Sequence, residues 1–197
     1  KTNEEMLQSW GDLTQVQIYG YGTMMGSDGK PLYLDDAAIA GIKQIPHVLA
    51  ATPYAQGYTM SGTITAGRND RYTMDISNLI GIDPTALEPM GFALQSGSWP
   101  TNTPASEKST KLQVLVGAST GYGFEDSRKS YNSPKRYRYE GQTDASGKTL
   151  PPFVDINKDE MTLTLKTGDG STEKTRTWEL EVVGVLEPDG AKGYWTQ

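Results

Sequence analysis

The chain has 197 residues, no cysteine, one histidine and a formal net charge of −6. Its length suits one domain, or one domain that carries an inserted subdomain. The missing thiols exclude disulfides, thiolate metal sites and cysteine nucleophiles, and a pI of about 4.8 argues against nucleic acid as a partner.

The first third of the chain predicts a β-α-β opening. Residues 13–19 alternate apolar and polar side chains, which is typical of a half-buried strand, and residues 20–30 are rich in turn formers. Asp35 suits the N-cap of a helix whose apolar residues recur at helical spacing until Pro46 ends it. Residues 48–66 are then expected to be extended.

The middle of the chain predicts a hairpin, a short helix and a loop. Residues 67–70 suit the turn of the hairpin, and residues 71–82 suit its returning strand. Asp83 and Pro84 then suit the N-cap and the first position of a short helix that runs to about Met90. Residues 96–109 are polar, contain two prolines and are expected to form an exposed loop.

The C-terminal half predicts further strands. The alternation over residues 111–116 predicts a strand, whereas residues 119–152 have weak periodicity. Residues 161–166 and 177–186 alternate well, and the turn formers in residues 167–171 indicate that the two segments pair as a hairpin. The balance of elements predicts an α+β fold in which strands dominate.

A Gly-x-Ser-x-Gly motif at residues 117–121 resembles the nucleophile elbow of serine hydrolases. That chemistry needs a general base downstream of Ser119. The chain's one histidine, His47, lies far upstream beside a proline and is expected to be a surface turn residue. We therefore predict no catalytic residue and no enzyme.

A second motif, Asp155-x-Asn157-x-Asp159, matches the first three ligand positions of a calcium loop. The sixth position should be glycine and is Glu160, and the twelfth should be glutamate and is Lys166. We therefore predict no metal site, and no motif in the chain indicates a cofactor.

A basic and aromatic stretch is the main candidate for partner binding. Residues 127–139 contain no acidic residue, and an extended 136–139 segment would place its two cations and two aromatics on opposite faces. Such a surface suits anionic lipid headgroups, cell-envelope polymers or an acidic partner, but equally a solvated edge strand protected by its charges. The candidate partner-binding residues are Arg136, Tyr137, Arg138, Tyr139 and Trp99. Trp10, Trp99, Tyr194 and Trp195 are expected to pack or anchor, with a sugar platform as the alternative.

Five stretches follow one another in the chain: a helix with Ile39-x-x-Ile42-x-x-Ile45-Pro46-His47-Val48 before Ala51-Thr52-Pro53, then Ile80-Gly81-Ile82-Asp83-Pro84, Gly91-Phe92-x-Leu94-x-x-Gly97-x-Trp99, Val114-Leu115-Val116-Gly117 and Val182-Val183-Gly184-Val185-Leu186. In this order they resemble the extracytoplasmic core domain of MacB-like ABC transporter permeases, a group that includes FtsX-type and LolC-type proteins.

This resemblance implies a domain between the first two transmembrane helices of a permease, on the extracytoplasmic side of a bacterial cell membrane. It implies a discontinuous β-α-β porter-like subdomain, residues 1–66 and 167–197, with an inserted strand-rich subdomain over residues 67–166. Such a domain is non-catalytic and transmits conformational change. The implied partners are the permease's transmembrane helices, its cytoplasmic ATPase, a second permease copy, and an extracytoplasmic accessory protein or peptide substrate.

The family pattern continues after residues 182–186 with another β-α-β unit, so we expect the 197 residues to be a trimmed piece or a shorter relative. Residues 123–152 have no counterpart in that pattern, and insertions of this kind are where partner specificity is expected. The alternative function is an exported cell-surface module that binds carbohydrate or peptide through exposed Trp and Tyr side chains.

Overall fold

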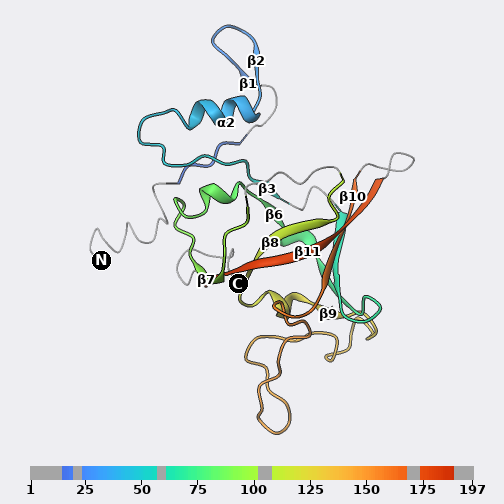
Figure 1. Cartoon of the computed structure of the whole chain (residues 1–197). Helices are drawn as coiled ribbons and strands as arrows, with labels where there is room; N and C mark the ends of the chain where they lie inside the picture. Colours follow the sequence, from blue (N-terminus) through green and yellow to red (C-terminus); the bar gives the residue numbers. More distant parts are fainter. Residues whose placement is uncertain (1–14, 20–23, 57–60, 102–107, 168–173, 189–197) are drawn as a thin grey trace.

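The computed structural model describes residues 15–19, 24–56, 61–101, 108–167 and 174–188, and the structural statements below concern these ranges. They form a mostly antiparallel β-sheet with one α-helix (Figure 1). The predicted α+β class is therefore confirmed in this coarse form. The described residues include no helix that is long and apolar enough to cross a membrane.

The main sheet has seven strands, ordered β7-β11-β10-β4-β5-β9, with β8 also paired to β11. The strands are β4 (Ser61–Ala66), β5 (Tyr72–Asp75), β7 (Leu94–Gly97), β8 (Lys111–Gly117), β9 (Glu125–Asp126), β10 (Met161–Thr167) and β11 (Lys174–Leu186).

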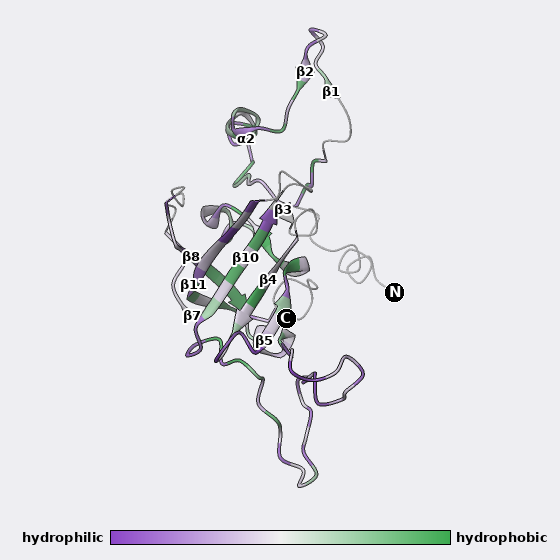
Figure 2. Cartoon of the chain, turned by 90° about the vertical axis from the view of Figure 1, so that its right-hand side faces the viewer, coloured by the Kyte–Doolittle hydropathy of each residue, from purple (hydrophilic) through white to green (hydrophobic). Residues whose placement is uncertain are grey.

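The centre of the sheet is the β10–β11 hairpin that the sequence predicted. Its antiparallel register places Leu163 opposite Trp178, and on the other side β4 places Ile64 opposite Leu163. The alternation of apolar and polar residues in β10 therefore turns Met161 and Leu163 into one core, where each is only 2% exposed. Phe124 and Val154, which come from the segment between β8 and β10, are buried in the same cluster. Figure 2 shows the hydrophobic residues along the strands of this sheet.

Strand β11 is long enough to join two groups of strands. Its residues Glu179 and Leu180 pair with β10 on one edge and with β8 on the other. Its last residues pair antiparallel with β7, while β8 runs parallel to it. The strand predicted over residues 111–116 is confirmed, but β7 corrects the expectation of a loop over residues 96–109, since Ser96 and Gly97 pair with β11.

The N-terminal part is built from short elements. A hairpin of β1 (Met24–Met25) and β2 (Pro31–Leu32) precedes helix α2 (Asp36–Ile42), and the two-residue strands β3 (Ala55–Gln56) and β6 (Ile80–Gly81) pair with each other. Figures 1 and 2 both show α2 and the β1–β2 hairpin at one end of the molecule, beyond the main sheet. The predicted N-cap is confirmed, because Asp35 Oδ1 accepts a hydrogen bond from the backbone N–H of Ala38 at 3.0 Å.

The prediction of a strand over residues 13–19 is wrong for its described part, residues 15–19, which have no strand partner. Val16 and Ile18 remain 82% and 51% exposed. An alternating pattern forms a strand only where another strand pairs with its edge and a core covers its apolar face. Among the described residues, neither is present for residues 15–19. The β-α-β opening is thus reduced to the short hairpin, α2 and β3.

The predicted hairpin around residues 67–70 is confirmed, but its returning strand is shorter than expected. Strand β5 ends at Asp75, whose side chain caps a 3₁₀ turn, η2 (Ile76–Asn78), by accepting from the N–H of Ser77. Asp83 likewise caps η3 (Pro84–Ala86), a 3₁₀ turn rather than a helix to Met90. Each aspartate ends an extended segment, because its side chain accepts a hydrogen bond from a nearby backbone N–H in place of a strand partner.

The subdomain division predicted at residues 66/67 and 166/167 stays a prediction. The main sheet contains β4 and β11, from the porter-like ranges, and it pairs both with β10 from the predicted insertion.

Candidate functional site

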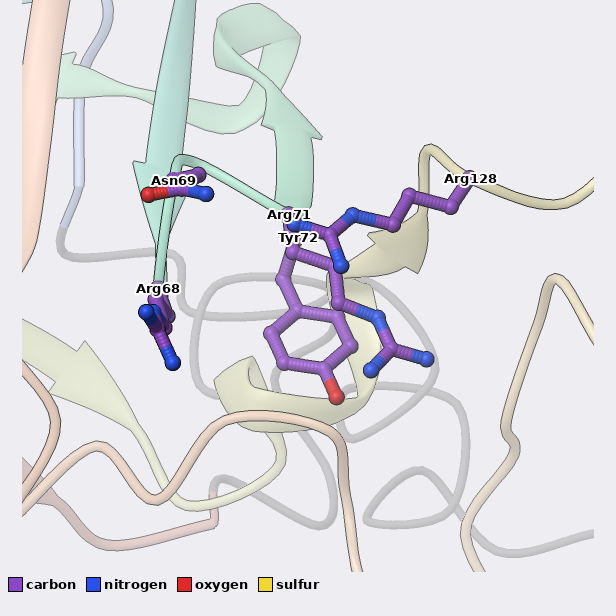
Figure 3. A pocket seen from close by; sticks show the side chains of 5 residues that line it. All are labelled: Arg68, Asn69, Arg71, Tyr72 and Arg128. Carbon is purple, nitrogen blue, oxygen red and sulfur yellow. The ribbon is translucent and has the colours of Figure 1, made fainter.

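The candidate site is a basic pocket of about 340 Å³ at the end of the sheet where β5 meets β9 (Figure 3). We call it the arginine pocket. It is lined by Arg68, Asn69, Arg71, Tyr72 and Arg128. The first four residues come from the β4–β5 turn and the start of β5, and the last follows β9.

The turn is tight because three of its residues adopt left-handed backbone conformations. Gly67, Asn69 and Asp70 have φ angles of 76°, 56° and 49°, values that glycine and short polar residues tolerate best. A Cβ atom on Gly67 would lie 2.8 Å from the ring of Tyr72. The glycine therefore lets the turn close over the tyrosine and places Arg68 at its tip.

Arg71 is held by a buried carboxylate. Its Nε and Nη2 donate to the two carboxylate oxygens of Asp126 at 3.1 and 2.6 Å, a two-pronged geometry that suits guanidinium and carboxylate. Asp126 is only 1% exposed. The hydrogen bonds from Arg71 lower the pKa of Asp126 despite its burial, which acts in the opposite direction. The pair therefore stays ionised and fixes the guanidinium at the pocket.

Aromatic stacking fixes the floor beside Arg71. Tyr72 stacks on Phe153 with ring centroids 5.1 Å apart, and the Arg71 guanidinium carbon lies 5.1 Å from the centroid of Tyr72. Arg138 lies over Phe153 at 4.3 Å and donates to the carbonyl of Pro151. Cations over aromatic faces are stabilising, so this set of side chains stiffens the pocket wall.

The other two arginines of the pocket have no ionic partner among the described residues. Arg128 donates its backbone N–H to Asp126 Oδ1 at 3.1 Å, which anchors its main chain and leaves its side chain reaching toward Arg71 and Tyr72 (Figure 3). Asp70, the carboxylate nearest to Arg68 in sequence, accepts a hydrogen bond from Thr65 instead. The pocket therefore holds two uncompensated positive charges within an acidic chain.

The predicted partner-binding stretch lies near this pocket but is not an edge strand. Arg136 pairs with Glu125 and donates to the carbonyl of Lys129, and its own carbonyl accepts from the N–H of Asp126. Tyr137 packs edge-on against Tyr131. The alternative reading of this stretch as a solvated edge strand is not confirmed, because residues 136–139 are assigned to no strand and Arg136 is instead tied to β9 by the contacts above.

The remaining candidates are scattered. Tyr139 is 65% exposed, whereas Trp99 is half-buried beside the end of β7. Arg138 is occupied by the contacts with Phe153 and Pro151 described above. Trp10, Tyr194 and Trp195 lie outside the described residues. Partner binding by the five predicted residues stays a prediction, and the structure brings only the four from residues 136–139 together.

Ser119 does not have the surroundings of a nucleophile elbow. It is followed by the 3₁₀ turn η4 (Thr120–Gly123) rather than an α-helix, and its hydroxyl donates to Glu140 at 2.7 Å. His47 is exposed in a turn at a φ of 71°, as a surface turn residue would be.

The carboxylates of the calcium-like motif serve the local turn. Asp155 accepts from the N–H of Asn157 and from the Lys158 ammonium at 2.8 Å, and Asp159 accepts from the N–H of Asp155. Within the described ranges, no group of three or more His, Cys, Asp or Glu side chains is arranged to hold a metal ion.

A second surface has a different character. Most of the exposed large hydrophobic side chains lie in residues 16–54, and we call them the N-terminal apolar surface. They are Val16, Ile18, Tyr19, Met25, Leu32, Tyr33, Leu34, Ile45, Leu49 and Tyr54. Outside this range, the described part of the chain exposes only Tyr131 and Tyr139 to a similar extent. Ten exposed large hydrophobic side chains within one segment favour contact with a protein or a membrane.

Sequence patterns missed Arg68 and Arg71 because the pocket is made by strand pairing. The usable signal was the pair of basic residues in and directly after the 67–70 turn, Arg68 and Arg71, but only the pairing of β5 with β9 brings them to Arg128. Comparison of the chain with models of protein families, with curated proteins and with solved structures found no match. Function is therefore inferred from this chain's own residues.

Proposed function

We propose that the chain is the extracytoplasmic, non-catalytic domain of an ABC transporter permease of the MacB-like type. The observation that carries the proposal is the ordered series of five family-like stretches, together with the way these stretches pack on one another. In this role the domain passes conformational change between the permease's transmembrane helices and an accessory protein or peptide substrate. The cytoplasmic ATPase of the same transporter supplies the energy.

The first two stretches contact each other. Lys43, just after α2, donates to Asp83 at 3.2 Å, and the N–H of Asp83 donates to the hydroxyl of Thr52 at 2.7 Å. Ala55 pairs with Gly81 in the β3–β6 ladder directly beside these contacts. The helix, the Thr-Pro segment and the Ile-Gly-Ile-Asp-Pro turn thus form one unit, which supports reading the two stretches together as parts of one family-like arrangement.

The last three stretches are neighbouring strands. Val182 of β11 pairs with Val114 of β8, and Gly184 pairs with both Leu115 of β8 and Gly97 of β7. Each of these stretches looked unspecific as an isolated peptide. Because all three stretches meet on β11, they support the interpretation that these stretches form one structural unit.

The N-terminal apolar surface supports a permanent partner. Leu49 is 85% exposed and Tyr33 is 70% exposed, which is costly for a domain that works alone in water. In the proposed transporter this end contacts the permease's own membrane-proximal part or the second permease copy. The surface lies at the opposite end of the molecule from the loops over residues 128–150 (Figures 1 and 2).

The test uses the complete gene product, and it exploits the absence of cysteine in these 197 residues. Single cysteines are placed at Tyr139 (Y139C), which is 65% exposed, and at Leu163 (L163C), which is 2% exposed. Any cysteine elsewhere in the gene product is first replaced by serine. Intact cells are then treated with a membrane-impermeant thiol reagent.

We expect Y139C to be labelled in intact cells and L163C to be labelled only after denaturation. We also expect an ATPase subunit to copurify with the tagged protein, and hydrophobic helices to flank these residues in the parent gene. A gene without flanking helices, or Y139C labelled only in lysed cells, would overturn the proposal. Recovery of the protein from the medium would instead favour the exported module, for which saturable glycan binding lost in Trp99→Ala is the deciding observation.

A further inference from the structure

We infer that the arginine pocket is a binding site for a phosphate group. The inference stands on the pocket's own geometry and goes beyond the proposed transport function. The ligand chemistry is a phosphate carried either by a small soluble ester or by a lipid headgroup. Both sources present the same tetrahedral, negatively charged group.

The charge of the pocket matches a dianion. Asp126 neutralises Arg71, and Arg68 and Arg128 keep two positive charges without a described ionic partner. Guanidinium groups match phosphate oxygens in geometry as well as in charge. A carboxylate ligand would bring one charge and two oxygens to three arginines, whereas a phosphate brings up to two charges and enough oxygens for all three.

The pocket is organised before any ligand arrives. Asp126 holds the Arg71 guanidinium through Nε and Nη2, which leaves its Nη1 free to donate into the pocket. The same carboxylate accepts from the backbone N–H of Arg128, so a single buried group holds the guanidinium of Arg71 and anchors the main chain of Arg128. Groups that are already ordered lose less conformational entropy on binding, which favours affinity at a small site.

Unpaired arginines are unusual in this molecule. The other described arginines are each engaged within the chain: Arg71 with Asp126, Arg136 with Glu125, Arg138 with the Pro151 carbonyl and the Phe153 ring, and Arg176 with the Trp178 ring. Arg68 and Arg128 instead face a hollow of about 340 Å³. Since a water molecule takes about 30 Å³ in the liquid, the hollow holds a phosphate and several atoms of the group that it esterifies.

The test is isothermal titration calorimetry on the whole chain in a phosphate-free buffer of low ionic strength. Three probes separate the sources: inorganic phosphate, glycerol 3-phosphate, and phosphatidylcholine vesicles with or without phosphatidic acid. The pocket variant is R68Q/R128Q. Its matched control is K135Q/K148Q, which removes the same charge from two exposed lysines outside the pocket. Thermal unfolding is measured to check that both variants remain folded.

We expect wild type to bind at least one phosphate probe saturably and R68Q/R128Q to bind it at least tenfold more weakly. The control variant should differ from wild type by less than threefold, and raising the salt to about 150 mM should weaken wild-type binding. Preference for glycerol 3-phosphate identifies a soluble ester, and preference for phosphatidic acid vesicles identifies a lipid headgroup. Equal weakening in both variants, or no saturable binding of any probe by folded wild type, would overturn the inference.

Discussion

At the scale of single residues, Asp126 organises the candidate site. It is buried, and its two oxygens receive Nε and Nη2 of Arg71 and the N–H of Arg128. Ser127 continues the same link by donating through both its N–H and its hydroxyl to the carbonyl of Arg71. One carboxylate thus joins the start of β5 to the end of β9, which is otherwise held by a two-residue ladder.

Replacing Asp126 by asparagine tests this role. Asn has the same shape but no charge, so it leaves Arg71 without its ionic partner, and we expect the free energy of unfolding to fall by about 2 kcal/mol at pH 7. Urea unfolding followed by tryptophan fluorescence measures the change. As a control, Asp28→Asn removes a largely exposed pair with Lys30 and should change stability by less than about 0.5 kcal/mol. Equal stability of D126N and wild type would contradict the assignment.

The lowered pKa of Asp126 also predicts the direction of acid sensitivity. Because its folded-state pKa lies below the unfolded value near 4, the unfolded chain binds more protons in acid. Stability is therefore complete above about pH 5 and is lost as the pH falls through the folded-state pKa. Arg136 lowers the pKa of Glu125, and Thr85 lowers the pKa of Asp83. Both carboxyls therefore also make the folded state less stable in acid.

The measurement is the free energy of unfolding of wild type and D126N between pH 7 and pH 3. We expect a shallower acid slope in D126N, because one of the carboxyls with a lowered pKa no longer titrates. Parallel curves over the whole range would show that the Asp126 carboxyl does not contribute to the acid sensitivity.

At the scale of elements, the C-terminal half of β11 depends on two facing glycines. Gly97 of β7 pairs with Gly184 of β11, and a Cβ on Gly97 would lie 2.3 Å from the carbonyl oxygen of Val183. Gly97 also has a φ of 86°. The close approach lets β7 and β8 flank the same three or four residues of β11, so the glycine pair decides whether this edge of the sheet forms.

We therefore expect Gly97→Ala to cost about 3 kcal/mol, from the clash and the left-handed backbone together. The matched control is Gly141→Ala, since Gly141 has a similar φ of 77° but nothing within 4 Å of the position of a Cβ. The control should lose only about 1 kcal/mol, the cost of the backbone conformation. Thermal unfolding of both variants measures the difference, and equal losses would show that the close approach to Val183 is not required.

At the scale of the whole molecule, the sheet and the N-terminal part contribute unequally to stability. Leu163 is 2% exposed at the centre of the sheet, whereas Leu49 is 85% exposed beyond α2. Removing buried side chains leaves cavities, and removing exposed ones does not. The molecule is therefore expected to owe its fold to the sheet, and the N-terminal apolar surface is expected to contribute little to the stability of the isolated chain.

The corresponding prediction compares two truncations of the same residue type. Leu163→Ala should lower the free energy of unfolding by about 3 kcal/mol, and Leu49→Ala should change it by less than about 0.5 kcal/mol. In the complete gene product, we expect Leu49→Ser to reduce copurification of the partner without changing the melting temperature of the isolated chain. A large loss of stability in Leu49→Ala would show that this surface is needed for folding.

Local chemistry made several elements predictable. Asp35 and Asp83 each accept a hydrogen bond from a backbone N–H two or three residues ahead, and such short-range capping depends on little beyond the neighbouring sequence. The β10–β11 hairpin was predictable for a related reason, since alternation over two adjacent runs specifies both the strands and their shared core face. Residues 15–19 show the limit, because the same alternation has no strand to pair with.

The pairing of strands that lie far apart in the chain was not predictable from the sequence. The parallel contact of β8 with β11 joins residues that lie more than sixty positions apart, and nothing local distinguishes it from an antiparallel one. The same is true of the pairing between Tyr72 and Asp126, on which the arginine pocket depends. The basic residues within 127–139 were visible in the sequence. The pairing of β5 with β9 decides which of them line the pocket, as Arg128 does, and which pair within the chain, as Arg136 does with Glu125.

The sequence by itself determined the exclusions and the local elements: an acidic chain without cysteine, an α+β composition, two aspartate caps and one central hairpin. These depend on residue types and on neighbours a few positions away. Only the tertiary structure decided which cations are free, which glycines face each other and which apolar residues stay uncovered. Charge compensation, close approach and burial are relations between distant segments, so they exist only once the sheet has brought those segments together.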